Sequence, residues 1–319
     1  MMVVTYGEAL VDLIEQPDGA FAAILGGSVC NFTLAVARQG LPVTYLNRLS
    51  HDSFGDRFAQ QLGAAGVVLA SPQRSALPTA LAVVTLDAHK VPSYAFHRAL
   101  VADRDITLAQ AVAALPPAVT LFHTGGLALV PADLDATLGV AAAAAAAGAL
   151  ISIDANLRPL AVADLASYAA GVRRALAMAH LIKVSEEDLL YLGLPDTDPV
   201  AAARLLFDGS AAQLVALTLG GQGAVLLART GHVALPVPPG VTVVDTVGAG
   251  DCFQAGLVAS LHQAGDLAPG ALAALDPGLL ARALRYAIAT ASIDVMRKGC
   301  NPPLRAEVDH FLTVTGEVA

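Results

Sequence analysis

The stretch from Val241 to Gly256 constrains the fold of this chain more than any other part of its sequence. Its first four residues are rich in β-branched side chains and predict a strand, which a Gly248-Ala249-Gly250 turn follows. From Asp251 on, apolar residues recur at the spacing of a helix. Free backbone N–H groups at a helix N-terminus make such a turn a candidate anion site. The same residues also suit a purely structural tight turn with Asp251 as the helix N-cap, so the stretch alone supports both interpretations.

The rest of the chain alternates between expected strands and helices. Strands are expected at 2–6, 43–49, 119–123, 149–154, 180–184 and 214–219, with a meander at 224–228 and 232–236. Helices are expected near 29–40, 51–66, 105–114, 131–147, 163–178, from 185 onward, 251–264 and 278–295. This rhythm predicts an α/β fold with a doubly wound, mostly parallel sheet flanked by helices.

Several polar or glycine residues follow the ends of expected strands, namely Asp154, Ser185, Gly220 and the segment Asp245–Asp251. Ligands bind doubly wound sheets at the carboxyl ends of their strands. We therefore expect these residues to converge on one face of the sheet.

Two hairpin-like pairs of segments, at about 9–25 and 80–98, stand outside the alternation. Turn signals lie inside each of them, at 16–19 and 88–92. We expect the two hairpins to pair as a small separate sheet inserted in a single domain that spans 1–319.

The amino-acid composition of the chain limits the kinds of partner that it can bind. The most apolar run, 138–153, is too short and too rich in alanine and glycine for a membrane span, and the N-terminus does not resemble a signal peptide. A net charge of −9 with only three lysines argues against nucleic-acid binding. Three cysteines lie far apart without a Cys-x-x-Cys pair, which favours a reducing, cytoplasmic location over a disulfide framework. A small-molecule partner remains, and single arginines and backbone amides suffice to hold a small anion.

Familiar catalytic motifs of other classes are missing from the sequence. It has no P-loop, and Gly221-Gln222-Gly223 lacks the third glycine of a dinucleotide fingerprint. It has no His-Glu-x-x-His or Gly-x-Ser-x-Gly pattern either. His123 ends an expected strand and is interpreted as a buried histidine with a hydrogen-bond partner.

Two glycine-rich segments carry a resemblance to a known family. Asp245-Thr-Val-Gly-Ala-Gly-Asp251 resembles the second signature of the ribokinase (PfkB) family of carbohydrate kinases. Gly26-Gly27-Ser-Val-Cys-Asn31 is similar to the first signature, about 215 residues earlier. The resemblance covers essentially the whole chain. Intermediate blocks are most similar to the fructokinase branch, namely Gly7–Asp12, Phe96–Arg98 with Ala102-Asp103, Asp154–Arg158, Lys183–Glu187 and Arg297–Gly299.

The resemblance implies roles for individual residues. Asp251 would be the general base for the attacking sugar hydroxyl, and the amides of Gly248, Ala249 and Gly250 would form the anion hole. Contacts to the sugar would come from Asp12, Gly27, Asn31, Arg98 and Arg158. The nucleotide would be bound at Ser185, Thr218, Gly220 and Gly223.

Two departures from the family pattern concern cations. The family's Asn-x-x-Glu motif, which organises Mg²⁺ through water, stands here as Ser185-Glu-Glu-Asp188, so the carboxylate is either Glu187 or Asp188. Val247 replaces a commoner threonine of the second signature. The family's loop for a monovalent cation such as K⁺ is matched by Asp245, Val247, Asp294, Arg297, Gly299 and Pro303.

The function that the resemblance implies is ATP-dependent phosphorylation of a sugar, with fructose as the first candidate and the small sheet as a lid that pairs two subunits into a homodimer. A 2-keto-3-deoxygluconate kinase and a ribokinase are the alternatives of the same class, since Arg98 and Arg158 also suit a carboxylate. An adenosine kinase is disfavoured because 5% aromatic residues and no tryptophan leave few surfaces for base stacking. The alternative of a different class is a sugar sensor without catalysis.

Overall fold

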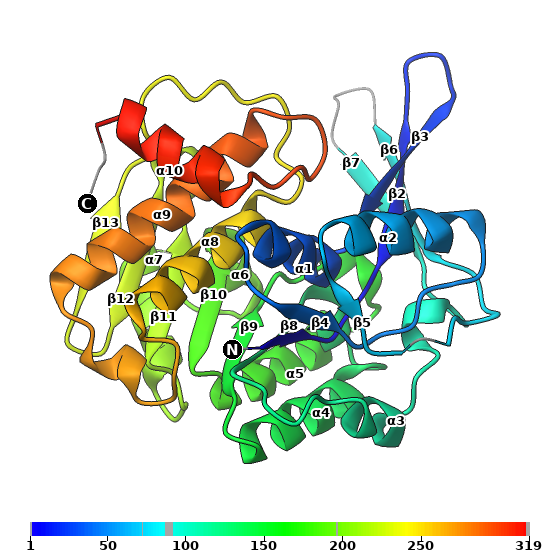
Figure 1. Cartoon of the computed structure of the whole chain (residues 1–319), viewed down its shortest axis with the longest axis horizontal. Helices are drawn as coiled ribbons and strands as arrows, with labels where there is room; N and C mark the ends of the chain where they lie inside the picture. The colour runs from blue at the N-terminus through cyan, green and yellow to red at the C-terminus, as the bar shows by residue number, and fades with distance from the viewer. Residues whose placement is uncertain (1, 72, 87–91, 196, 317–319) are drawn as a thin grey trace.

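The computed structural model describes residues 2–71, 73–86, 92–195 and 197–316 (Figure 1). Within these residues the large sheet has nine strands. Their order across the sheet is β13 (Gly231–Leu235), β12 (Ala224–Ala228), β11 (Leu214–Thr218), β10 (Leu181–Ser185), β9 (Leu150–Asp154), β8 (Leu121–Gly125), β1 (Val3–Thr5), β4 (Val43–Tyr45) and β5 (Val68–Leu69). The strands from β5 to β11 in this order run parallel, and β12 and β13 continue the sheet antiparallel. The expected doubly wound, mostly parallel sheet is confirmed.

Helices cover both faces of the large sheet (Figure 1). One core layer packs α1 (Ser28–Arg38), α2 (Ser53–Ala64), α8 (Ala249–Ala264), α9 (Pro277–Val295) and α10 (Arg305–Val314). The other packs α3 (Leu108–Ala113), α4 (Leu134–Ala146), α5 (Leu165–Met178), α6 (Glu186–Tyr191) and α7 (Pro199–Arg204). Neighbouring strand residues alternate between the layers, as Leu121 and Phe122 do, which explains the continuous apolar strands.

Short 3₁₀ turns connect these elements at Ala102–Arg104, Gly126–Leu129, Pro159–Ala161, Leu205–Phe207, Gly220–Gln222 and Ala271–Ala274. No helix in the described part of the chain is long and apolar enough to cross a membrane.

A second sheet of four strands stands apart from the large one, at the top right of Figure 1. Its order is β3 (Phe21–Gly26), β2 (Leu10–Glu15), β6 (Ala80–Leu86) and β7 (Pro92–His97). Each hairpin is antiparallel, and β2 joins β6 in parallel with Asp12 opposite Ala82. The two hairpins therefore pair as expected, while the expected turn at 88–92 falls largely outside the described residues.

The expected strand at 241–244 is wrong. These residues form no strand among the described elements, and the side chains of Val243 and Val244 are 60% and 62% exposed. The N–H groups of Val244 and Asp245 donate to the carbonyl of Val295, at the end of α9, over 2.8 and 3.2 Å. β-Branched residues favour a strand only where a neighbouring strand is available for pairing. Here the neighbouring backbone is the end of a helix, so no strand forms.

The expected helix boundary at Asp251 is also wrong, because α8 begins at Ala249 with Gly248 as its N-cap. Gly248 has a φ of 85°, in the left-handed region, and a Cβ there would overlap Cys300 Sγ. Asp251 therefore lies inside the first turn of α8 rather than at its cap. The sequence did not predict three elements, β5, α7 and α10. The strand expected at 43–49 is shorter in the structure and covers only β4.

Candidate active site

A cavity of about 1040 Å³ lies at the carboxyl ends of the parallel strands. Its wall includes residues that follow five of them: Glu8 after β1, Gly126 after β8, Arg158 after β9, Ser185 at the end of β10 and Thr218 at the end of β11. The start of α8, from Gly248 to Asp251, completes this wall. Of the residues expected to converge from their positions after strands, Ser185, Gly220 and 246–251 line this wall, whereas Asp154 and Asp245 do not.

The small sheet forms the opposite wall. Alternate residues of β2, Leu10, Asp12 and Ile14, share one face of that strand and line the cavity together with Val84, Tyr94 and Phe96. Burial raises the pKa of Asp12 to about 6, and the positive charge of Arg158 opposes that rise. Asp12 and Arg158 therefore belong to the same end of the cavity.

Asp251 lies in the wall of the cavity, where two residues from the N-terminal part of the sequence donate hydrogen bonds to its carboxylate. Ser28 Oγ donates to Asp251 Oδ1 over 2.6 Å, and Asn31 Nδ2 donates to Oδ2 over 2.9 Å. Both donors lie on α1, which packs against α8. Burial raises the pKa of Asp251, although the two hydrogen bonds and Lys183 act against that rise. A carboxylate with a raised pKa is a stronger base, which suits proton abstraction from a hydroxyl.

The set of free backbone amides around Asp251 differs from the set expected to form an anion hole. The N–H of Ala249 donates to the carbonyl of Thr246 over 3.2 Å, so it is already occupied. The structure records no acceptor among the described residues for the N–H groups of Gly248, Gly250 and Asp251. Since these donors stand at the N-terminus of a sixteen-residue helix, they offer an anion both hydrogen bonds and the favourable end of the helix dipole.

Lys183 is a site residue that the sequence reading missed. It lies on β10, lines the cavity and pairs with Asp154 over 3.0 Å. A Cβ on Gly250 would stand 2.9 Å from Lys183 Nζ, so the ammonium lies against the start of α8. Burial disfavours the charge, but Asp154, with further help from Asp188 and Asp251, outweighs it and raises the pKa of Lys183. Lys183 could have been predicted as a site residue, because it is a charged side chain inside an otherwise apolar strand.

Glu8 is a second missed residue. Its Oε1 accepts the N–H of Ser28 over 3.1 Å, and its buried Oε2 has no hydrogen-bond partner among the described residues. Burial raises the pKa of Glu8 to about 7, against the effect of Arg98. Through Ser28, Glu8 supports the residue that holds Asp251.

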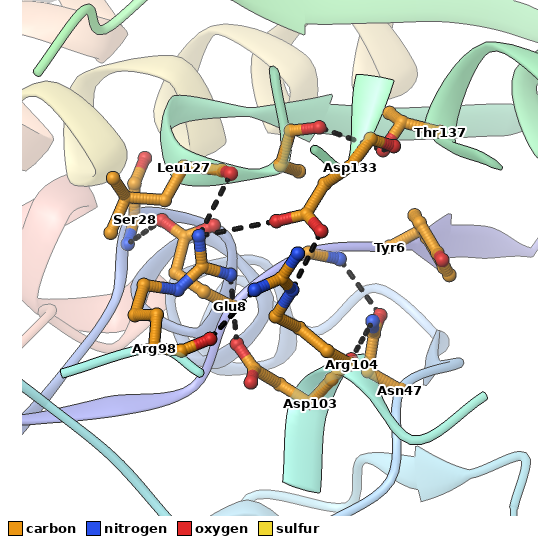
Figure 2. Close-up of polar contacts among 12 residues, drawn as sticks. Tyr6, Glu8, Ser28, Asn47, Arg98, Asp103, Arg104, Leu127, Asp133 and Thr137 are labelled. Carbon is orange, nitrogen blue, oxygen red and sulfur yellow. Dashed lines mark hydrogen bonds and ion pairs between the residues drawn. The ribbon is translucent and has the colours of Figure 1, made fainter. Parts of the chain in front are cut away.

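Arg98, expected to bind the substrate, is placed elsewhere. Figure 2 shows its guanidinium between Asp103 and Asp133, at 3.2 and 3.3 Å, with a further hydrogen bond to the carbonyl of Leu127. Its side chain is 10% exposed and is not part of the described cavity wall. Arg98 is held away from the cavity by tertiary contacts, because the carboxylates of Asp103 and Asp133 neutralise its charge. Arg158, by contrast, lines the cavity with an exposed side chain.

The two candidate magnesium carboxylates differ in their hydrogen bonding. Asp188 accepts bonds from the N–H and Oγ of Ser185 and from the N–H of Leu157, so it closes a capping box and holds two strand ends together. Glu187 is exposed in the cavity wall and accepts a bond from Tyr191 Oη. Of the two, Glu187 retains more capacity to reach a hydrated cation.

Of the residues expected around a monovalent cation, Asp245, Val247 and Gly299 are joined by hydrogen bonds. Asp245 Oδ1 accepts the N–H of Val247 over 3.1 Å, and Oδ2 accepts the N–H of Gly299 over 2.9 Å. Asp294 Oδ1 accepts the N–H of Asn301 over 2.8 Å. Arg297 pairs with Glu307, and the carbonyl of Pro303 is bonded by Gln39, so these two residues are engaged elsewhere. Among the six, only Val247 is part of the described cavity wall.

The far end of the cavity is bordered by glycines and apolar side chains. Thr218, Gly220 and Gly223 line it as expected, and Val237, Val241, Val243, Ile288 and Val295 add an apolar wall. A flat, partly apolar group fits such a wall, while its charged part would lie toward α8.

His123 is confirmed as a buried histidine. Its Nδ1 lies 3.0 Å from Ser152 Oγ, and its ring stacks on Phe32 with centroids 3.6 Å apart. Burial lowers the pKa of His123 to about 3, so it stays neutral.

The cavity thus holds a buried carboxylate beside free amides at a helix N-terminus, between a small sheet and a parallel one, and this arrangement suits chemistry on a hydroxyl next to an anionic group. The chain belongs to the family described as pfkB family carbohydrate kinase, whose sequence model matches residues 1–307. It is therefore a sugar kinase.

Named relatives agree with the family. The chain is 33% identical to a fructokinase of Rhizobium leguminosarum bv. trifolii over 86% of its own length and 84% of that protein. The crystal structure of a Xylella fastidiosa fructokinase with bound ATP shares 30% identity, covers 99% of both chains and has a TM-score of 0.88. Aminoimidazole riboside kinase from Salmonella enterica, complexed with aminoimidazole riboside and an ATP analogue, has 27% identity, coverage of 98% and 100%, and a TM-score of 0.82.

Proposed function

We propose that the protein is an ATP-dependent fructokinase with Asp251 as its general base. The observation that carries the proposal is the placement of Asp251 by Ser28 and Asn31 inside the cavity, next to unoccupied amides of α8. Abstraction of the hydroxyl proton by Asp251 turns the sugar into a nucleophile toward the γ-phosphoryl group. The N–H groups of Gly248 and Gly250 then stabilise the charge that develops on that group.

Fructose is the proposed acceptor. Asp12, Gly27, Asn31 and Arg158 surround the end of the cavity next to Asp251 and supply donors and acceptors for sugar hydroxyls. The fructokinases among the relatives support this choice over other sugars.

ATP is the proposed donor, with its base along the apolar wall and its phosphates toward Gly220, Gly223 and the start of α8. A Mg²⁺ ion would be held through water near Glu187 and would neutralise phosphate charge when bound. Lys183 adds a fixed positive charge on the same side. A monovalent cation such as K⁺ would lie by Asp245 and Gly299, where it would stabilise the loop that precedes Gly248.

The small sheet is proposed to act as a lid that excludes water, and its outer face is proposed to pair two subunits into a homodimer. Phe21 pairs with Glu15 on the face of this sheet that is turned away from the cavity, and its 46% exposure supports a contact surface there. We also propose a cytoplasmic location, consistent with cysteines that are all free.

A panel of acceptors tests the proposal. A coupled assay for ADP formation should show the highest kcat/KM with fructose, and lower values with ribose, aminoimidazole riboside and 2-keto-3-deoxygluconate. The keto acid is the second candidate, because the exposed Arg158 in the cavity wall suits a carboxylate. Preference for it would shift the assignment to a keto-acid kinase, and absence of acceptor-dependent ADP formation would leave a sugar sensor.

A further inference from the structure

Two thiols and one carboxylate from separate segments meet behind the turn that opens α8. Cys252 lies in the first turns of α8, Asp294 near the end of α9, and Cys300 in the loop that follows. One ligand atom from each lies within 4.8 Å of the other two. Cys252 and Asp294 are 0% and 1% exposed, whereas Cys300 is half-buried.

The carboxylate of Asp294 is incompletely bonded. Its Oδ1 accepts the N–H of Asn301, but its buried Oδ2 receives no hydrogen bond from an N–H or O–H group of the described residues. The thiols nearby are only weak donors. A buried carboxylate oxygen without a strong donor is costly, so the arrangement points to a ligand that would satisfy it.

We propose that Cys252, Asp294 and Cys300 bind one thiophilic divalent cation of the class of Zn²⁺ or Cd²⁺. Binding replaces the two S–H protons by two metal–sulfur bonds, with a carboxylate oxygen as third ligand and water as fourth, and releases two protons. Thiolate ligands select such ions over Mg²⁺ and K⁺, which prefer oxygen. The two thiols thus distinguish this site from the loop around Asp245 that is expected to hold a monovalent cation, with which it shares Asp294.

Occupancy of the site would reach the catalytic turn directly. Cys252 adjoins Asp251 in the chain, and Cys300 Sγ fills the volume that a Cβ on Gly248 would need. Metal–sulfur bonds of about 2.3 Å draw both sulfurs toward one point, and the turn that carries the base and the free amides moves with them. We therefore expect the cation to lower kcat; this consequence rests on the proposed function, whereas the binding itself does not.

A titration of the reduced, chelator-treated protein with CdCl₂ tests the binding. The expected result is thiolate-to-cadmium absorption in the ultraviolet that saturates at one ion per chain, and a higher Tm with the ion present. Cys252→Ser and Cys300→Ser should each weaken binding by at least roughly tenfold. Cys30→Ser is the matched control, because Cys30 is a buried thiol outside the cluster, and it should bind as the unmodified chain does.

A second measurement keeps the test valid if a variant fails to fold. In the unmodified protein, Cd²⁺ should slow alkylation of Cys300, mapped by mass spectrometry. No thiolate absorption at excess Cd²⁺, or unchanged binding in the Cys252→Ser/Cys300→Ser variant, would overturn the proposal. Binding without any change in kcat would overturn only its coupling to catalysis, and loss of fructose phosphorylation in the metal-free protein would count against the proposed function alone.

Discussion

Ser28 Oγ lies 2.6 Å from Asp251 Oδ1 and donates a hydrogen bond across 223 positions of the sequence. The contact joins the first glycine signature to the second, because Ser28 opens α1 and Asp251 lies in the first turn of α8. It places the proposed base and orients its carboxylate toward the cavity.

Loss of this hydrogen bond should move the pH profile of catalysis. Ser28→Ala removes a donor that stabilises the ionised form of Asp251, so the pKa of Asp251 should rise further. A hydrogen bond to a charged group is worth about 1.5–3 kcal/mol. The acidic limb of kcat should therefore move to higher pH by roughly 1–2 pH units. Ser28→Thr, which keeps a hydroxyl, is the control. An unchanged acidic limb in Ser28→Ala would contradict the role given to Ser28.

Glu8 should make folding stability depend on pH. Its pKa of about 7 in the folded chain exceeds its ordinary value of 4.5, so the folded state holds the proton more tightly than the unfolded state does. Its contribution to stability is therefore full below about pH 4.5 and is lost as the pH rises to about 7. Because the group is buried, the loss between pH 5 and pH 8 is about 2–3 kcal/mol in the free energy of unfolding.

Denaturant unfolding of Glu8→Gln at both pH values measures this effect. The variant lacks the titrating group, so the difference in stability between it and the unmodified chain should change by that amount over the same range. Parallel pH profiles for the two proteins would show that Glu8 is ionised in the folded state at all these pH values.

Arg98 and Arg158 should behave differently when each is replaced by alanine. Arg98→Ala leaves the buried carboxylate of Asp103 without its partner, and breaking such a pair costs about 3–5 kcal/mol. Its main effect should be a lower Tm. Arg158→Ala should keep the Tm and raise KM for the sugar, since the side chain is exposed in the cavity wall. A large KM effect with an unchanged Tm in Arg98→Ala would restore the sequence-based assignment of Arg98 to the substrate.

Gly248 should be sensitive for two separable reasons. Gly248→Ala strains a residue with φ of 85° and also overlaps Cys300 Sγ. Gly265→Ala, at the other end of α8, has φ of 81° with no atom near the added Cβ. Both should lose about 1 kcal/mol of stability from the backbone alone, but only Gly248→Ala should also lose kcat. Equal kcat in the two variants would contradict the role of this turn in catalysis.

The large sheet could be predicted from the sequence because strands buried on both faces appear as continuous apolar runs, such as 214–219. The meeting of Asp12, Asn31, Arg158 and Asp251 in one cavity could be predicted too, but from the resemblance of their segments to the motifs of the carbohydrate kinase family rather than from local patterns. The rest depends on tertiary neighbours. No local pattern shows that Asp103 and Asp133 hold Arg98, or that the β-branched run at 241–244 meets a helix end.

The rate of phosphoryl transfer in Asp251→Asn tests the central claim most directly. The change keeps the size of the side chain but removes the proton acceptor, so kcat should fall by about 10²–10⁴-fold while binding of the sugar stays near normal. Retention of kcat within a few-fold of the unmodified protein, with folding confirmed by its Tm, would contradict the assignment of Asp251 as the base.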